Sequence, residues 1–225
     1  MLEQRQIAIA DDTTVSTVVA YPDCRTAPTT AVILAHGAGN DMTNPFLSAV
    51  HEGLAAHGFI AVKFNFPYKE RGRRPPDPAP VLERCYGRVI DAVRGDRRIA
   101  PRRLVIGGKS LGGRMASHLA AHGVAVDGLI FLGYPLHPVG KVEQLRVAHL
   151  EKIRAPMLFV TGTRDALCRL DLLRQTIQRL QVPVTLEIVE GGDHSFNVPK
   201  AMRRDPRAVW DEIVTASARW LAKLA

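Results

Sequence analysis

The chain of 225 residues is long enough for one domain with a full hydrophobic core, since 46% of its residues are hydrophobic and 23% are charged. No apolar run approaches the roughly 18 residues of a membrane span, residues 1–6 lack the apolar core of a signal peptide, and the three scattered cysteines form neither a disulfide framework nor a redox pair. We therefore expect a reduced, cytoplasmic protein, a single domain over 1–225, with no membrane association.

The net charge of +8 at pH 7 is the one unusual bulk property. The excess is spread along the chain and is mostly arginine, with its densest group at Arg71, Arg73 and Arg74. A nucleic-acid-binding protein is expected to gather basic residues on one face beside aromatic side chains. We therefore predict a generally basic surface and no nucleic-acid partner, with an anion-binding patch as the alternative.

Strand-like and helix-like segments alternate along the chain, which predicts an α/β fold with a mostly parallel sheet and helices on both faces. Segments 6–10 and 14–20 are rich in β-formers and flank Asp11-Asp12, which predicts an opening antiparallel hairpin. The short apolar runs that predict buried strands are 31–35, 60–64, 104–106, 129–132, 157–161 and 184–189.

Helices are indicated between these runs. Asn44-Pro45 and Asp205-Pro206 each place a capping residue before a proline at the first helical position. An apolar stripe over 81–93 recurs at helical spacing, and so does one in the last helix. The Pro- and Arg-rich segment 71–80 is the one irregular stretch of any length, and it has the size of a functional loop.

Ser110 lies in the sequence Gly-Lys-Ser-Leu-Gly, directly after the apolar run 104–106 and before a helix-like segment that begins near Met115. A strand, a sharp turn and a helix are the context in which a nucleophilic serine is exposed in a hydrolase of the α/β type. The pattern alone is weak, so its partners decide the interpretation.

Three further loops follow predicted strands. His36-Gly37-Ala38-Gly39-Asn40 has small residues whose backbone N–H groups could join that of Leu111 in an oxyanion hole, with Ala38 the first candidate and Gly39 the second. Asp165 follows the strand 157–161, where a triad acid belongs, and Asp171 is its rival in a helix-like segment. His194 follows the strand 184–189 and is the candidate base.

The order Ser110, Asp165, His194, each just after a successive strand, predicts a catalytic triad. His118 and His122 are four residues apart on a helix, but no third ligand is evident, so we predict no metal and no other cofactor. His137 follows another strand and is predicted either to line the pocket or to be a loop residue with a backbone partner.

These residues resemble the α/β-hydrolase superfamily, and more narrowly its predicted hydrolases labelled dienelactone-hydrolase-like. That branch is similar to the hydrolase-like domain shared by a testis-expressed protein and a subunit of a nuclear histone-acetyltransferase complex. The segments that carry the resemblance are LAHGAGND (34–41), FNFPYKERGRRPPD (64–77), GGKSLGGR (107–114), LGYPLHPVGK (132–141), GTRDA (162–166) and GGDHSF (191–196).

The resemblance implies the α/β-hydrolase fold with about eight strands, and it places the triad on Ser110, Asp165 and His194. It brings no substrate, because true dienelactone hydrolases use a cysteine where this chain has Ser110. Many members of the superfamily insert a cap between the strands that correspond to 129–132 and the one beginning near 157. Here that stretch has room for one short helix near 142–150, so we expect no large cap domain and an open site.

The sequence thus predicts a serine hydrolase that acts on a small ester or thioester through an acyl-enzyme. A small serine peptidase and a non-catalytic binding or scaffold protein on the same fold are the alternatives. No feature indicates the oligomeric state. Side chains expected to line the substrate site are His36, Asn40, Arg73, Arg74, His137 and Lys141. The arginines and Lys141 would favour anionic acyl substrates, and the competing interpretation ties Arg73 and Arg74 to Asp77 or to a helix end.

Overall fold

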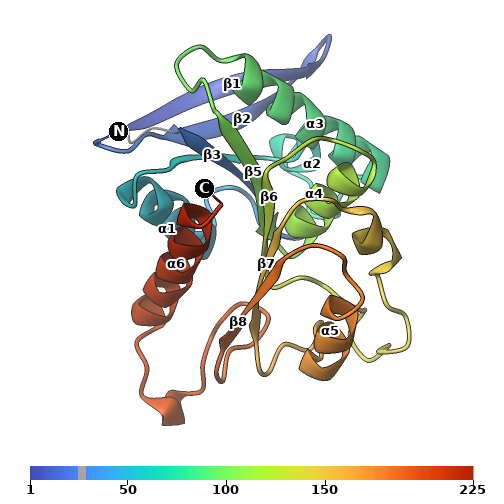
Figure 1. The fold of residues 1–225 in the computed structure, drawn as a ribbon. Coiled ribbons are helices and arrows are strands. Elements are labelled where there is room, and N and C mark those ends of the chain that lie inside the picture. The colour runs from blue at the N-terminus through green and yellow to red at the C-terminus, as the bar shows by residue number, and fades with distance from the viewer. Residues whose placement is uncertain (25–28, 225) are drawn as a thin grey trace.

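A twisted eight-stranded sheet forms the centre of the protein in the computed structural model, which describes residues 1–24 and 29–224 (Figure 1). The strand order is β1-β2-β4-β3-β5-β6-β7-β8; β1 pairs antiparallel with β2 and β2 with β4, and the pairs from β4 to β8 are parallel. The strands are β1 (Leu2–Ala10), β2 (Thr13–Ala20), β3 (Thr30–Ala35), β4 (Ile60–Phe64), β5 (Arg103–Lys109), β6 (Gly128–Leu132), β7 (Met157–Gly162) and β8 (Val184–Val189).

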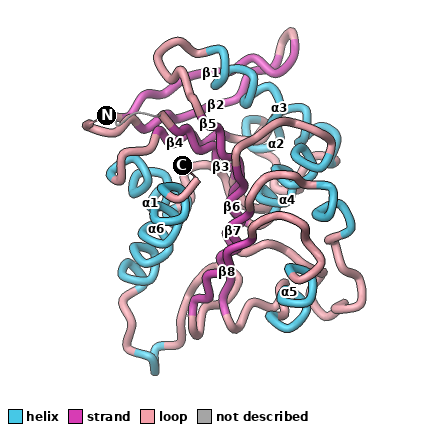
Figure 2. The backbone as a smooth tube through the Cα atoms, viewed as in Figure 1, coloured by secondary structure: helices cyan, strands magenta, loops and turns pink. Residues whose placement is uncertain are grey.

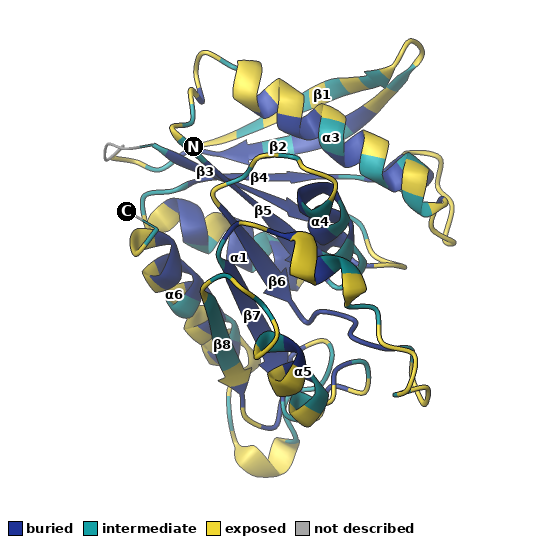
Figure 3. Cartoon of the chain, turned by 45° about the vertical axis from the view of Figure 1, so that its right-hand side comes forward, coloured by how far each residue is buried: buried dark blue, intermediate teal, exposed yellow. Residues whose placement is uncertain are grey.

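Every predicted strand lies within or overlaps an observed one. The parallel strands β3, β4, β6 and β7 are buried along their whole length, because helices cover both faces of the sheet (Figure 3). By contrast, β1 alternates between exposed and half-buried residues, and the edge strand β8 is mostly half-buried. The predicted opening hairpin is confirmed, since β1 and β2 pair antiparallel across the turn at Asp11-Asp12.

Helices pack on the two faces of the sheet in separate groups (Figure 1). Buried side chains of α1 and α6 form one apolar cluster with the sheet, and those of α3, α4 and α5 form the other. The helices are α1 (Pro45–Ala56), α2 (Pro67–Glu70), α3 (Ala79–Gly95), α4 (Leu111–Ala121), α5 (Leu170–Ile177) and α6 (Pro206–Ala222), with 3-10 helices η1 (Ala148–Lys152) and η2 (Lys200–Met202). Within the part of the chain that is described, no helix combines the length and apolar character required to cross a bilayer.

The capping residues act as the sequence predicts. The Asn44 side chain accepts a hydrogen bond from the Leu47 N–H at 3.2 Å, and the Asp205 side chain accepts one from the Arg207 N–H at 3.0 Å. A proline follows each cap at the first helical position, where its missing N–H costs nothing. These local signals fix where α1 and α6 begin.

The stretch near 142–150, which has room for one short helix, is helical over only part of its length. The structure has the five-residue η1 there, and the rest of the segment between β6 and β7 is loop, without a large cap domain among the described residues (Figure 2). Tertiary contacts use the backbone groups that a helix would need: the Arg146 N–H donates to the Leu136 carbonyl at 2.8 Å, and the Arg146 carbonyl accepts the Tyr134 hydroxyl at 3.0 Å. These contacts hold the segment against the loop that follows β6.

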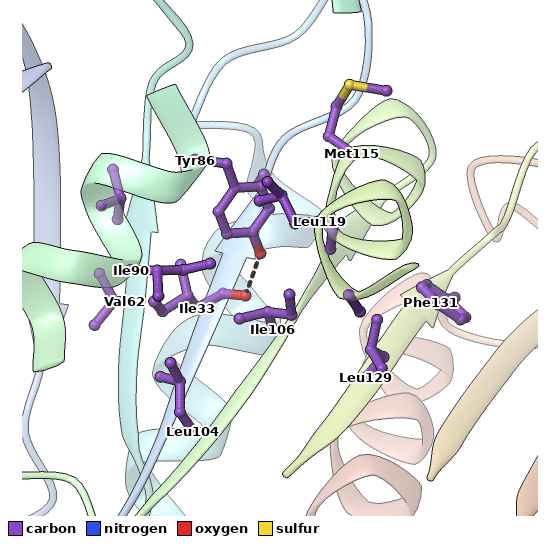
Figure 4. Packing of buried hydrophobic residues seen from close by; sticks show 14 of the residues in the cluster. Ile33, Val62, Tyr86, Ile90, Leu104, Ile106, Met115, Leu119, Leu129 and Phe131 are labelled. Carbon is purple, nitrogen blue, oxygen red and sulfur yellow. Dashed lines mark hydrogen bonds between the residues drawn. The ribbon is translucent and has the colours of Figure 1, made fainter. Parts of the chain in front are cut away.

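Tyr86 on α3 connects two central strands. Its hydroxyl lies 2.8 Å from the Ile33 carbonyl of β3 and 2.7 Å from the Gly107 carbonyl of β5, and it accepts the Gly107 N–H at 2.9 Å. The side chain is fully buried among Ile90, Ile106 and neighbouring apolar residues (Figure 4). One phenol therefore satisfies backbone groups at a place where water is excluded, as buried polar groups require.

The variant Tyr86→Phe keeps the ring and removes the hydroxyl. We expect it to lower the free energy of unfolding by about 1–3 kcal/mol, because the variant loses hydrogen bonds to backbone groups in a region from which water is excluded. Urea denaturation of both proteins measures the difference. An unchanged free energy of unfolding would show that the hydroxyl does not support the β3–β5 pair.

Candidate active site

Ser110 lies at the sharp turn between β5 and α4. Its backbone angles are φ 49° and ψ −109°, which residues other than glycine rarely adopt. Gly108 and Gly112 make this turn possible: a Cβ built on either would lie 2.2 Å from the Ala35 carbonyl oxygen of β3. The structure therefore has the strand, turn and helix that the sequence predicts around Ser110, with its side chain half-buried at the carboxyl edge of the sheet.

A continuous row of hydrogen bonds joins Ser110, His194 and Asp165. The distance from Ser110 Oγ to His194 Nε2 is 2.9 Å, and His194 Nδ1 lies 2.9 and 2.8 Å from the two carboxylate oxygens of Asp165. Because Nδ1–H donates to the carboxylate, Nε2 is left to accept the serine hydroxyl. The geometry is that of a serine with a general base beside it and an oriented, buried carboxylate behind.

Sheet topology explains why these residues meet. The strands β5, β7 and β8 are parallel, so their carboxyl ends lie at one edge of the sheet. The loops after β7 and β8 are joined by backbone bonds, from the Arg164 N–H to the Gly192 carbonyl at 2.8 Å and from the Thr163 N–H to the Val189 carbonyl at 3.1 Å. The Asp165 side chain is fully buried and also accepts the Leu167 N–H at 2.8 Å, which fixes its orientation.

Asp171, the rival acid, lies elsewhere. It is in the first turn of α5, exposed, and bound to the guanidinium of Arg169. Its carboxylate therefore does not take part in the row, and Asp165 alone contacts His194 among the described acids.

The residues expected to supply backbone donors flank Ser110. Leu111 is the first residue of α4, so its N–H has no acceptor within the helix. Ala38 and Gly39 are exposed in the loop after β3, whose turn is closed by a 3.3 Å bond from the Asn40 N–H to the Gly37 carbonyl. No acceptor within the described residues is recorded for the N–H of Leu111 or of Ala38, so both remain able to bind a ligand.

His36 does not line a substrate site, contrary to the expectation from sequence. It is fully buried; its Nδ1–H donates to the Gly37 carbonyl at 2.9 Å and its Nε2 accepts the Phe66 N–H at 3.1 Å. Burial lowers the pKa of His36 to about 4, so the ring is neutral at neutral pH. His36 joins the loop that contains Ala38 to the loop after β4.

His137 has the same arrangement one loop away. It is 1% exposed, its Nδ1–H donates to the Pro138 carbonyl at 2.9 Å, and its Nε2 accepts the Arg169 N–H at 3.2 Å. Of the two predictions for His137, the loop residue with a backbone partner is therefore confirmed, and the pocket-lining role is wrong. Its ring connects the loop after β6 to the start of α5.

The basic residues expected near the site differ in whether they are close to a carboxylate. Arg73 donates to the carboxylate of Asp77, and Arg71 lies 4.0 Å from the same carboxylate, as the competing interpretation of this loop expects for Arg73. Arg74 and Lys141 are exposed, and no ion pair is recorded for either within the described residues. A substrate-lining role for Arg74 and Lys141 stays a prediction.

A pocket of about 190 Å³ has the predicted lining residue Asn40 in its wall. Lys109, which precedes Ser110, and Ser195, which follows His194, are also in the wall. The sequence interpretation missed these residues, although Lys109 and Ser195 lie within the motifs that it singled out. The remaining lining residues are Asn44, Pro45, Phe46, Asn197 and Trp210.

His118 and His122, the weak candidate metal pair, are both directed at Glu83 on α3. Their Nδ1 atoms lie 2.7 and 3.6 Å from its carboxylate oxygens. In the described ranges 1–24 and 29–224, no group of three or more His, Cys, Asp or Glu is arranged to hold a metal ion.

Residues 28–222 match the protein family described as alpha/beta hydrolase domain. The chain belongs to the alpha/beta hydrolase family. The match covers the sheet from β3 onward and every residue of the hydrogen-bonded row, and it confirms the resemblance to the α/β-hydrolase superfamily.

Solved structures share the fold of this alpha/beta hydrolase at low sequence identity. A dienelactone hydrolase from Anabaena variabilis superposes with a TM-score of 0.77 at 17% identity, covering 99% of this chain and 97% of its own. An alpha-beta serine hydrolase homologue from Coxiella burnetii gives 0.76 at 18%, covering 97% of each chain. A serine hydrolase without lid from Xanthomonas campestris gives 0.72 at 20%, covering 97% of this chain and 94% of its own.

The buried His36 makes stability depend on pH. In the unfolded chain His36 takes up a proton below its ordinary pKa of 6.5, whereas in the folded protein its pKa is about 4 and the ring stays neutral down to that pH. The free energy of unfolding therefore falls as the pH is lowered through this window, by up to about 3 kcal/mol for this one side chain. In His36→Gln we expect a shallower fall, measured by urea denaturation between pH 7 and pH 4. Equal slopes in the two proteins would contradict the assignment.

Proposed function

We propose that this protein is a serine hydrolase that cleaves a small ester or thioester, with Ser110 as nucleophile, His194 as general base and Asp165 as orienting acid. The observation that carries the proposal is the unbroken row from Ser110 Oγ to His194 and the buried Asp165 carboxylate. A serine hydroxyl is a weak nucleophile until an adjacent base can take its proton. The rare backbone conformation of Ser110 adds support, since strain of this kind collects at functional sites.

The reaction proceeds in two steps. Ser110 Oγ attacks the carbonyl carbon while its proton passes to His194 Nε2, and the same proton then leaves with the alcohol or thiol as the bond to the leaving group breaks. A water molecule, deprotonated by His194, attacks the acyl-enzyme and releases the acid. Asp165 holds Nδ1–H and stabilises the imidazolium that forms in each step.

The N–H groups of Leu111 and Ala38 bind the oxyanion of each tetrahedral intermediate, with Gly39 as the alternative to Ala38. The position of Leu111 at the N-terminus of α4 supports this, because the helix dipole favours negative charge there. The mechanism requires no metal and no organic cofactor.

Several finer expectations stay predictions. They are a cytoplasmic location, one domain over 1–225, the absence of a nucleic-acid partner, and a relation to the hydrolase-like domain of the testis-expressed protein and the histone-acetyltransferase subunit. A serine peptidase would use the same three residues, and a binding protein on this fold would need none of them. The presence of the complete row favours the enzyme over the binding protein.

Labelling by a fluorophosphonate probe, which reacts with activated serines, tests the proposal. We expect the wild-type protein to be labelled and Ser110→Ala and His194→Ala to lose the label. Turnover of any ester that the wild type hydrolyses should fall by about 10⁶-fold in Ser110→Ala, as when a triad nucleophile is removed.

Ser117 offers a matched control. Its Oγ lies 2.8 Å from His149 Nε2, but the residue is fully buried in α4, so Ser117→Ala should keep the label. A folded wild-type protein that takes up no probe would overturn the proposal and favour the binding protein.

A further inference from the structure

Lys109 is a buried cation next to the proposed nucleophile. It is the last residue of β5 and only 8% exposed. Its ammonium lies 5.6 Å from the centre of the Phe196 ring. The ammonium and the His194 ring both lie close to Gly133: a Cβ built on Gly133 would be 2.9 Å from Lys109 Nζ and 3.5 Å from His194 Nδ1. Lysine is rarely buried without a paired group, so this position calls for an explanation.

The Lys109 ammonium faces the Phe196 ring as a cation–π contact, but within the described residues it has no hydrogen-bonded partner and no ion-paired partner within 4.0 Å. The nearby carboxylates of Asp165 and Asp193 attract it from a greater distance, but they are occupied: Asp165 binds His194 and Leu167, and Asp193 accepts the N–H groups of Ser195 and Asn197. Burial lowers the pKa of Lys109 to about 8, and the charged form still predominates at pH 7.

The pocket of about 190 Å³ described above has Lys109 in its wall. The N-terminus of α1 also lines it, through Asn44, Pro45 and Phe46. This end of a twelve-residue helix carries a partial positive charge. The aromatic rings of Phe46 and Trp210, 5.8 Å apart, supply an apolar surface between the polar groups.

We propose that this pocket is a substrate subsite in which Lys109 binds a carboxylate of the substrate, so that the enzyme prefers esters that carry a second, ionised carboxyl group. The inference rests on the proposed function, since Ser110 would cleave the bond while Lys109 holds the far end of the molecule. The ammonium donates to the carboxylate, the α1 N-terminus adds to the attraction, and the rings contact the short carbon chain between the two ends.

Size and charge restrict the ligand to a small monoanion. The pocket holds a few carbon atoms and a carboxylate, and there is one ammonium to neutralise the charge. The carboxylates of Asp165 and Asp193 near Lys109 disfavour a dianion such as a phosphate ester. The net charge of +8 draws anions toward the protein at long range.

Two pairs of esters, matched in chain length, test the subsite. Monomethyl glutarate against methyl pentanoate places the carboxylate in the acyl part, and 3-acetoxypropanoate against propyl acetate places it in the alcohol part. Titration of released acid at constant pH gives kcat/KM for each. We expect the wild type to prefer the anionic member of at least one pair by about ten- to hundredfold, as for one charge-assisted hydrogen bond.

Lys109→Met removes the charge and keeps the chain length, and it should abolish this preference. Lys63→Met is the matched control, because Lys63 is equally buried, at 7% exposed, but its ammonium donates to Ser48 Oγ at 2.7 Å in another part of the fold. Lys63→Met should keep the wild-type ratio. If the wild type shows a ratio of kcat/KM between the anionic and the neutral ester near one in both pairs, the subsite is overturned, even if Lys109→Met fails to fold. If Lys109→Met lowers kcat/KM equally for the anionic and the neutral ester of a pair, the subsite is also overturned, because a lysine with a purely structural role predicts that result.

A binding measurement separates failure of the subsite from failure of the proposed function. Monomethyl glutarate should raise the melting temperature of Ser110→Ala, methyl pentanoate should not, and the double variant with Lys109→Met should lose the response. If the wild type hydrolyses no ester but this response is present, the subsite stands and the proposed function fails. If esters are hydrolysed without preference and the response is absent, the proposed function stands and the subsite is wrong.

Discussion

The approach of the β5–α4 turn to the end of β3 is the constraint on which the site depends. The Ala35 carbonyl occupies the space where side chains at positions 108 and 112 would begin, so both must be glycine. At this contact the chain reverses sharply, with Ser110 at φ 49° and its hydroxyl directed to His194. The same contact brings the loop after β3, with Ala38, beside the first turn of α4.

Two buried histidine rings give the surrounding loops their shape. His36 and His137 each follow a strand, donate to the next carbonyl along the chain, and accept an N–H from a distant loop. Each ring thus satisfies backbone groups of loop residues. Buried loop backbone needs such partners because it has no neighbouring strand or helical turn to bond with. These internal bonds hold the loops at the carboxyl edge of the sheet, and the described residues include no large cap domain over them.

The sequence by itself determined the strands, most helices and the three residues that form the hydrogen-bonded row, Ser110, His194 and Asp165. These features depend on local causes: apolar runs for buried strands, Asn44-Pro45 and Asp205-Pro206 for helix starts, and glycines around Ser110 for a sharp turn. Parallel strands end at one edge of a sheet, so the order of motifs along the chain was enough to bring Ser110, Asp165 and His194 together.

Tertiary structure decided what the remaining polar residues do. The stretch 142–150 has room for a short helix, but Leu136 and Tyr134 bind the backbone of Arg146, and the 3-10 helix begins only at Ala148. His36 and His137 are residue types typical of active sites, yet both are buried. Arg73 is bound to Asp77. Lys109, which was not predicted to line a site, is in the wall of the pocket. Sequence pattern reports which segments are apolar and where turns occur. Whether a polar side chain bonds to backbone or faces a pocket depends on distant loops, which only the folded chain brings near.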